Sequence, residues 1–163
     1  MTAGLRQKYY TGIGSRKTPQ NVCKELTLIA RKLNEAGYIL RSGGAVGADQ
    51  AFEYGAGDLK EIYRPRDHIP EWAYDEAAKM VPPNRPSFNL MSVPVQRILA
   101  RNMMQVLGKH GNTPSEFVVC WTPAGVDDGG TGYAMRCAKA HMVDVFNLRN
   151  GISHFSRAVI FDL

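Results

Sequence analysis

The stretch Arg41–Asp49, which reads Arg-Ser-Gly-Gly-Ala-Val-Gly-Ala-Asp, decides which fold can be predicted for this chain. The apolar run Tyr38–Leu40 before it is typical of a buried strand, and Gln50–Tyr54 after it predicts a helix. Glycine has no Cβ, so the backbone can turn sharply at this corner and an anion can approach its N–H groups. The positive end of the dipole of the following helix also attracts an anion. The stretch therefore predicts a phosphate-binding corner between a strand and a helix.

Two further glycine-rich corners repeat this arrangement. A strand at 8–11 runs into Gly12-Ile13-Gly14-Ser15-Arg16, and a strand at 116–121 leads through a loop to Gly129–Gly132 and a helix ending near 141. Strands that alternate with helices predict an α/β fold, with a mostly parallel sheet covered by helices on both faces. Because parallel strands end at the same edge of the sheet, the three corners are expected to lie on one rim.

The other expected elements complete a single domain over residues 1–163. Thr18 is the expected N-cap of a helix that ends at Gly37, and Ser92 is the expected N-cap of a helix over 92–107. Strands are expected at 59–63, 143–146 and 158–161. A proline-rich segment at about 64–91 interrupts the pattern. Its short helix at 71–80 and its aromatic residues predict an insertion or lid, with the anchors Trp72, Tyr74 and Phe88.

Composition restricts the class of protein. The formal charge of +5 permits, without requiring, a phosphate-bearing or nucleic-acid partner. The amino-terminal residues show no signal sequence and no run is long enough to cross a membrane, so a soluble, cytoplasmic protein without a membrane partner is expected. Neither the three cysteines (Cys23, Cys120, Cys137) nor the four histidines show a recognised ligand spacing, so no metal and no cofactor are expected.

Two common nucleotide-binding motifs are absent. The run Gly12–Lys17 lacks the last glycine of the dinucleotide fingerprint, and no GxxxxGK[ST] sequence occurs. The sequence therefore excludes the usual dinucleotide-binding and P-loop classes.

The ordered motifs Thr11–Arg16, Ser42–Asp49 and Gly130-Thr131, the last followed by Ala134, Ala138 and Val145, resemble DprA and the wider SLOG superfamily. The short chain, with Arg101-Asn102 and Cys120-Trp121-Thr122, is similar to phage-type single-domain SLOG proteins. The resemblance to LOG phosphoribohydrolases is more distant. The resemblance covers about residues 8–148. It implies a Rossmann-like three-layer sandwich that binds a nucleotide or single-stranded nucleic acid, and a homodimer is common among such proteins.

The resemblance to LOG enzymes breaks down at one functional position. Their GGxGTxxE-type motif carries a catalytic Glu, whereas Gly129–Gly132 here continues without one. Glycosidic cleavage needs a carboxylate. The catalytic residues are therefore unknown, and the weak candidates are Arg101, Asp128 and Glu53, with Asp49 and Asp127 as other acidic substitutes.

The residues expected to contact a phosphate-bearing ligand come from the three corners and one helix. Arg97 and Arg101 are four residues apart, so both are expected to reach the rim, and Trp121 is the best candidate for stacking on a base. The expected ligand contacts are Gly12, Gly14, Ser15, Arg16, Ser42, Gly43, Gly44, Gly47, Asp49, Arg101, Thr122, Gly129, Gly130 and Thr131.

Two functions remain open from the sequence. The first is DprA-like binding of single-stranded DNA in DNA processing or recombination, which the positive charge and the missing Glu favour. The alternative is a SLOG- or LOG-like enzyme or sensor that binds or hydrolyses a small nucleotide, which the lid-like segment favours.

Overall fold

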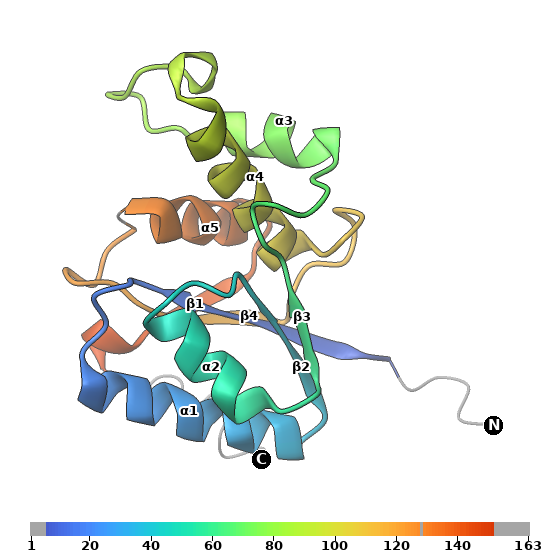
Figure 1. Ribbon diagram of the computed structural model, residues 1–163, viewed down its shortest axis with the longest axis vertical. Coiled ribbons are helices and arrows are strands. Elements are labelled where there is room, and N and C mark those ends of the chain that lie inside the picture. The colour runs from blue at the N-terminus through green and yellow to red at the C-terminus, as the bar shows by residue number, and fades with distance from the viewer. Residues whose placement is uncertain (1–5, 128, 152–163) are drawn as a thin grey trace.

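The computed structural model describes residues 6–127 and 129–151, and the strands in these residues form one five-stranded sheet. The elements are β1 (Lys8–Gly14), α1 (Gln20–Glu35), β2 (Tyr38–Ser42), α2 (Ala48–Ala56), β3 (Lys60–Ile62), α3 (Glu71–Lys79), η1 (Phe88–Leu90), α4 (Val93–Leu107), β4 (Phe117–Trp121), α5 (Gly129–Ala140), β5 (Asp144–Asn147) and η2 (Leu148–Asn150). The strand order is β3-β2-β1-β4-β5, and every neighbouring pair is parallel. Helices α1 and α2 cover one face of the sheet, and α3, α4 and α5 lie on the other side (Figure 1). The predicted α/β, Rossmann-like three-layer sandwich is confirmed.

Alternating residues of the central strands supply the two halves of the core. In β1, Tyr10 packs among the side chains of α1 and α2, whereas Ile13 packs with those of α4 and α5. In β4, Val119 packs with the side chains of α1 and α2, whereas Val118 packs with those of α4 and α5. All five residues of this strand are buried. A strand that buries both faces reads as a continuous apolar run, because neither face meets water. This burial explains why the predicted strand at 116–121 is an unbroken run of mostly apolar residues.

Local signals at the helix ends proved partly right. The Ser92 hydroxyl accepts a hydrogen bond from the N–H of Val95, which confirms it as an N-cap. The prediction for Thr18 is wrong, because its hydroxyl donates to the Ser15 carbonyl and α1 begins at Gln20 without a side-chain cap. The sixth strand expected at 158–161 lies outside the described residues.

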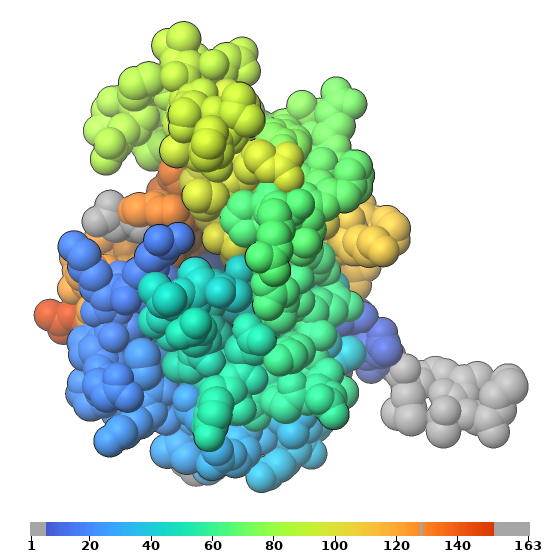
Figure 2. All heavy atoms as spheres, viewed as in Figure 1, coloured from blue at the N-terminus to red at the C-terminus, as the bar shows by residue number. Residues whose placement is uncertain are grey.

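The segment at 64–91 is an integral part of the layer that contains α4 and α5. Ala73, Ala77 and Phe88 are buried in the same cluster as the apolar side chains of these two helices, and Trp72 and Tyr74 pack against it. In the space-filling view the segment forms the upper part of the molecule, in green to yellow-green (Figure 2). The expected aromatic anchoring is thus present, while movement of the segment over a ligand stays a prediction.

Side chains of α4 also attach both ends of the segment to this helix. Arg97 donates from Nε to the Pro65 carbonyl at 2.8 Å and from Nη2 to the Asp67 carbonyl at 2.9 Å. Gln96 donates from Nε2 to the Met91 carbonyl at 2.9 Å. Arg97 therefore joins the start of the segment to α4. The expectation that it reaches the rim together with Arg101 is wrong.

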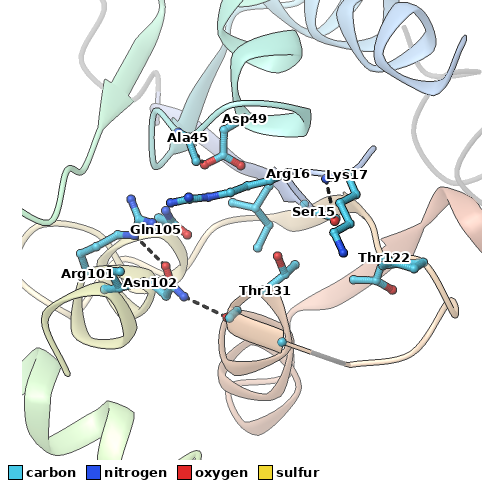
Figure 3. A pocket seen from close by; sticks show the side chains of 16 residues that line it. Ser15, Arg16, Lys17, Ala45, Asp49, Arg101, Asn102, Gln105, Thr122 and Thr131 are labelled. Atoms are coloured by element: carbon cyan, nitrogen blue, oxygen red, sulfur yellow. Dashed lines mark hydrogen bonds between the residues drawn. The ribbon is translucent and has the colours of Figure 1, made fainter. Parts of the chain in front are cut away.

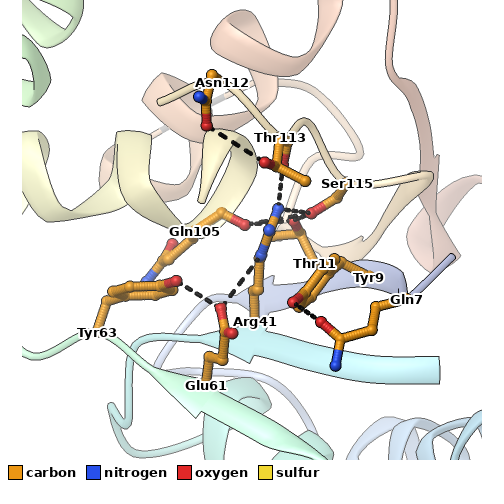
Figure 4. A network of polar contacts seen from close by, with 10 residues as sticks. All are labelled: Gln7, Tyr9, Thr11, Arg41, Glu61, Tyr63, Gln105, Asn112, Thr113 and Ser115. Atoms are coloured by element: carbon orange, nitrogen blue, oxygen red, sulfur yellow. Dashed lines mark hydrogen bonds and ion pairs between the residues drawn. The ribbon is translucent and has the colours of Figure 1, made fainter. Parts of the chain in front are cut away.

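A buried arginine joins the strands to the loop that follows α4 (Figure 4). Arg41, only 2% exposed, donates from Nη1 to the Thr113 carbonyl and to the Ser115 hydroxyl. Its Nε lies 3.5 Å from a Glu61 carboxylate oxygen, and its guanidinium stacks 3.9 Å from the centre of the Tyr9 ring. Because a buried guanidinium is costly without partners, these contacts define where the loop sits before β4.

Candidate functional site

A cleft of about 390 Å³ opens where β1 and β4 end. These neighbouring strands are the point at which the strand order reverses, because β1 leads outward to β2 and β3 and the chain then returns beside β1 as β4. In open parallel sheets this switch point is the usual ligand position. Its lining comes from the ends of both strands, from α4 and from the first turn of α5, as Figure 3 shows.

The structure brings most of the predicted ligand residues to this cleft. Those that line it are Gly14, Ser15, Arg16, Asp49, Arg101, Thr122, Gly129, Gly130 and Thr131. Gly43 and Gly44 line an adjoining groove of about 330 Å³, together with Arg64 and Arg66, and this groove shares Arg16, Ala45 and Arg101 with the cleft. The three corners thus meet at one place, although their residues serve different purposes.

At the first corner, two basic side chains extend into the cleft. Arg16 and Lys17 are exposed residues whose side chains line it (Figure 3). The Ser15 hydroxyl accepts a hydrogen bond from the N–H of Lys17 at 3.0 Å, which shapes the turn. Within residues 6–127 and 129–151, no carboxylate forms an ion pair with either basic side chain. Both charges are therefore available to an anion.

Three predicted ligand residues support the corners instead of lining the cleft. A Cβ at Gly12 would lie 2.6 Å from the Phe52 ring, so this glycine allows α2 to pack on the sheet. The Ser42 hydroxyl is buried and donates to the Gly12 carbonyl. Gly47 has φ +87°, and a Cβ there would lie 2.7 Å from the Ser15 carbonyl oxygen. These three residues hold the first and second corners together.

The second corner is occupied by a side chain of its own helix. Asp49, 4% exposed, accepts hydrogen bonds at one carboxylate oxygen from the N–H groups of Gly43 at 3.2 Å and Ala45 at 3.3 Å. The backbone donors predicted to hold a phosphate are thus already paired within the protein. Asp49 is a structural acceptor here, and the expectation that these two N–H groups are free for a ligand is wrong.

Asp49 and Arg101 are two ionisable residues that line the cleft between the corners. Burial raises the pKa of Asp49 from 3.8 to about 6, although the Arg101 charge and nearby backbone N–H groups lower it. Burial also lowers the pKa of Arg101, which Asp49 opposes and the positive charge of Arg16 reinforces. Arg16 and Arg101 both line the cleft, so two guanidinium groups place positive charge there, an arrangement that favours an anionic ligand.

Arg101 and Asn102 connect the second corner to the third. Arg101 donates from Nη1 to the Gly43 carbonyl at 2.8 Å and from Nε to the Asn102 side-chain oxygen at 2.7 Å. Asn102 in turn donates to the Gly130 carbonyl at 2.9 Å, at the start of α5. The helix dipole places partial positive charge at this end of α5, which adds to the attraction for an anion. Thr131, from the same turn, lies on the wall of the cleft (Figure 3).

Several expectations about individual residues are corrected. Glu53 lies on α2 in an ion pair with Lys60 at 3.0 Å and is not among the cleft residues. Asp127 faces Arg136 outside the cleft, and Trp121 is 8% exposed and does not line it. Asp128 lies outside the described residues. Asp49 is therefore the one carboxylate among the described cleft residues, and it is engaged by backbone N–H groups.

Other residues of the site were not among the predicted ligand contacts. Gln105 lies one helical turn after Arg101 on α4 and lines the cleft, a position that the four-residue spacing could have revealed. Lys17 was considered only as a break in the dinucleotide motif. Arg64 and Arg66 had no recognisable pattern, because only the pairing of β3 with β2 places them beside Gly44.

Among the comparisons with known proteins, the comparison with solved structures supports this architecture. No protein-family model matches the chain, and no curated protein matches it. Among solved structures, the chain is similar to DNA processing protein A from Helicobacter pylori, whose structure is described for its single-stranded DNA binding mode. The TM-score is 0.58 with 19% sequence identity, over 86% of this chain and 64% of that chain. The shared fold is thus that of DprA, and this chain spans less than two thirds of that protein. In the described part of the chain, no helix is long and apolar enough to span a membrane.

Proposed function

We propose that this chain binds single-stranded DNA along a basic track formed by the cleft and the adjoining groove. One observation carries the proposal: the two cavities share Arg16, Ala45 and Arg101, so they form one continuous surface. Cations from three separate parts of the chain line it. They are Arg16, Lys17, Arg64, Arg66 and Arg101.

The chemistry of the lining favours contacts with phosphates. The described cleft residues contain no aromatic side chain, so stacking on bases has little support within the cleft. Lys and Arg contacts to phosphates are largely independent of sequence and weaken as salt rises. The proposed binding is therefore expected to be tolerant of base sequence and strongly dependent on salt.

The similarity in fold also supports single-stranded DNA as the proposed ligand. A protein of this fold is described for single-stranded DNA binding, and we extend that role, with DNA processing or recombination as its context, to this chain as part of the proposal. A homodimer would place two such tracks on one particle.

A second candidate is the binding of one small nucleotide. The cleft volume of about 390 Å³ lies within the range of small-ligand pockets and supports this alternative. Hydrolysis of such a ligand has weaker support than its binding, because Asp49 is the only carboxylate among the described cleft residues and is already hydrogen-bonded.

Fluorescence anisotropy of a labelled single-stranded oligonucleotide, measured at several salt concentrations, tests the proposal. Arg16→Ala and Arg64→Ala are each expected to weaken binding and to reduce the salt slope by about 0.7, because each removes one phosphate contact to a single strand. The matched control is Arg31→Ala, which removes the same charge from an exposed position of α1 outside both cavities. Equal effects of all three substitutions would contradict a localised track. Complete displacement of the oligonucleotide by a mononucleotide would favour the second candidate.

A further inference from the structure

A second cluster of reactive side chains lies away from the cleft, between α3 and α5. Glu76 comes from α3, Cys137 from α5, and His141 from the residue just after the end of α5. One potential ligand atom from each residue can be chosen so that all three lie within 4.8 Å of one another. His141 Nε2 lies 2.8 Å from a Glu76 carboxylate oxygen.

The convergence follows from helix geometry. Cys137 and His141 are four residues apart, and the His141 N–H still donates to the Cys137 carbonyl at 3.1 Å, so both side chains belong to one helical face. Helix α3 packs on that face and brings Glu76 from 65 positions away in the sequence. The expectation that no Cys/His pair has ligand spacing is therefore wrong.

We propose that Glu76, Cys137 and His141 bind a zinc-like divalent metal ion. A thiolate, an imidazole nitrogen and a carboxylate oxygen are the three ligand types that zinc accepts in tetrahedral sites, and water can supply the fourth position. The thiolate selects a borderline-soft transition metal over Mg²⁺ or Ca²⁺, which prefer oxygen ligands. The ion would link the helix of the 64–91 segment to α5, whose other end lines the cleft.

Metal binding requires that the Cys137 thiol lose its proton and that the Lys79 side chain move away from Glu76. The Cys137 thiol loses its proton to solvent when its sulfur bonds to the metal. Burial, assisted by the Glu76 charge, raises the pKa of this thiol to about 12, so the positive metal ion must offset that cost. Lys79 lies 3.6 Å from the other Glu76 oxygen, but its side chain is 70% exposed and can move into water. The His141 side chain, 36% exposed, leaves a route for the ion.

The plain alternative is that His141 and Glu76 form a hydrogen bond between helices while Cys137 fills the core. Titration of the reduced, chelator-treated full chain with Co²⁺ distinguishes the two, because only a bound thiolate gives a sulfur-to-cobalt charge-transfer absorption. We expect this absorption to saturate at one ion per chain. It should vanish in Cys137→Ser and persist in the control Cys23→Ser, whose thiol is half-buried on α1 outside the cluster.

Two further variants keep the test decisive if the buried Cys137→Ser protein does not fold. His141→Ala and Glu76→Gln change partly exposed side chains. Each is expected to weaken Co²⁺ binding by at least about tenfold, because the loss of a residue that only hydrogen-bonds to a metal ligand already lowers metal affinity by that factor. Circular dichroism is the check that these variants are folded. Absence of the charge-transfer band, its loss only in Cys23→Ser, or unchanged affinity in both His141→Ala and Glu76→Gln would overturn the proposal.

Discussion

The packing of the first corner against the second can be tested by replacing Gly47 with alanine. Gly47 has φ +87° and ψ −126°, a backbone conformation that residues with a Cβ avoid, at a cost of about 1–3 kcal/mol. The new Cβ would also lie 2.7 Å from the Ser15 carbonyl oxygen and 2.9 Å from Arg16 Cα. Both are backbone atoms, so the corner itself must shift, which adds about 1–3 kcal/mol. We expect a total loss of about 2–6 kcal/mol in the free energy of unfolding.

Gly37 offers a matched control within the same chain. It also has a positive φ, +86°, but a Cβ there would meet nothing within 4 Å, so Gly37→Ala carries the strain of a positive φ without the clash. Urea unfolding of both variants measures the difference, with equal m-values as the check on two-state behaviour. Because the shift in Gly47→Ala displaces Arg16, oligonucleotide affinity is expected to fall in this variant and not in Gly37→Ala. Equal losses of stability in the two variants would refute the inferred contact between the corners.

Two other predictions concern buried charges. The pKa of Asp49 is raised from 3.8 to about 6 by folding, so its carboxyl favours the native state below pH 4, and this contribution falls by about 3 kcal/mol as pH rises from about 4 to above 6. In Asp49→Asn that pH-dependent decline should be missing, and urea unfolding series that run parallel for both proteins across this range would contradict the assignment. Arg41→Met should lower the free energy of unfolding by at least about 2 kcal/mol, because it removes charged hydrogen bonds to Thr113 and Ser115. Arg41→Lys should recover only part of this loss, since an ammonium lacks the planar fork; full recovery in thermal or urea unfolding would show that charge alone matters.

The described elements of the fold follow closely from local sequence patterns. Apolar runs of strand length, helical periodicity and glycines at the ends of elements are decided by neighbouring residues, and for this reason the order of strands and helices was predictable. The errors at helix ends have the same origin. Thr18 could cap α1 or bond to Ser15, and the choice depends on how the first corner packs against its surroundings.

The assignment of residues to the site was less predictable from sequence. The sequence showed that three glycine-rich corners would share one edge, because parallel strands end together. It could not show that the Asp49 carboxylate occupies the N–H groups of the second corner, or that Arg97 turns to the 64–91 segment while Arg101 turns to the cleft. Each of these outcomes depends on competition between partners that are distant in sequence.

The sequence by itself determined an α/β chain with its glycine corners on one rim, since strand, helix and turn signals act over a few residues. Only the tertiary structure decided which groups face one another across that rim. The strand order β3-β2-β1-β4-β5 sets Arg64 beside Gly44 and extends the cleft into a basic track. Likewise, the packing of α3 on α5 brings Glu76 to Cys137 and His141. Long-range packing carries no local periodicity, so these juxtapositions leave no readable pattern in a single sequence.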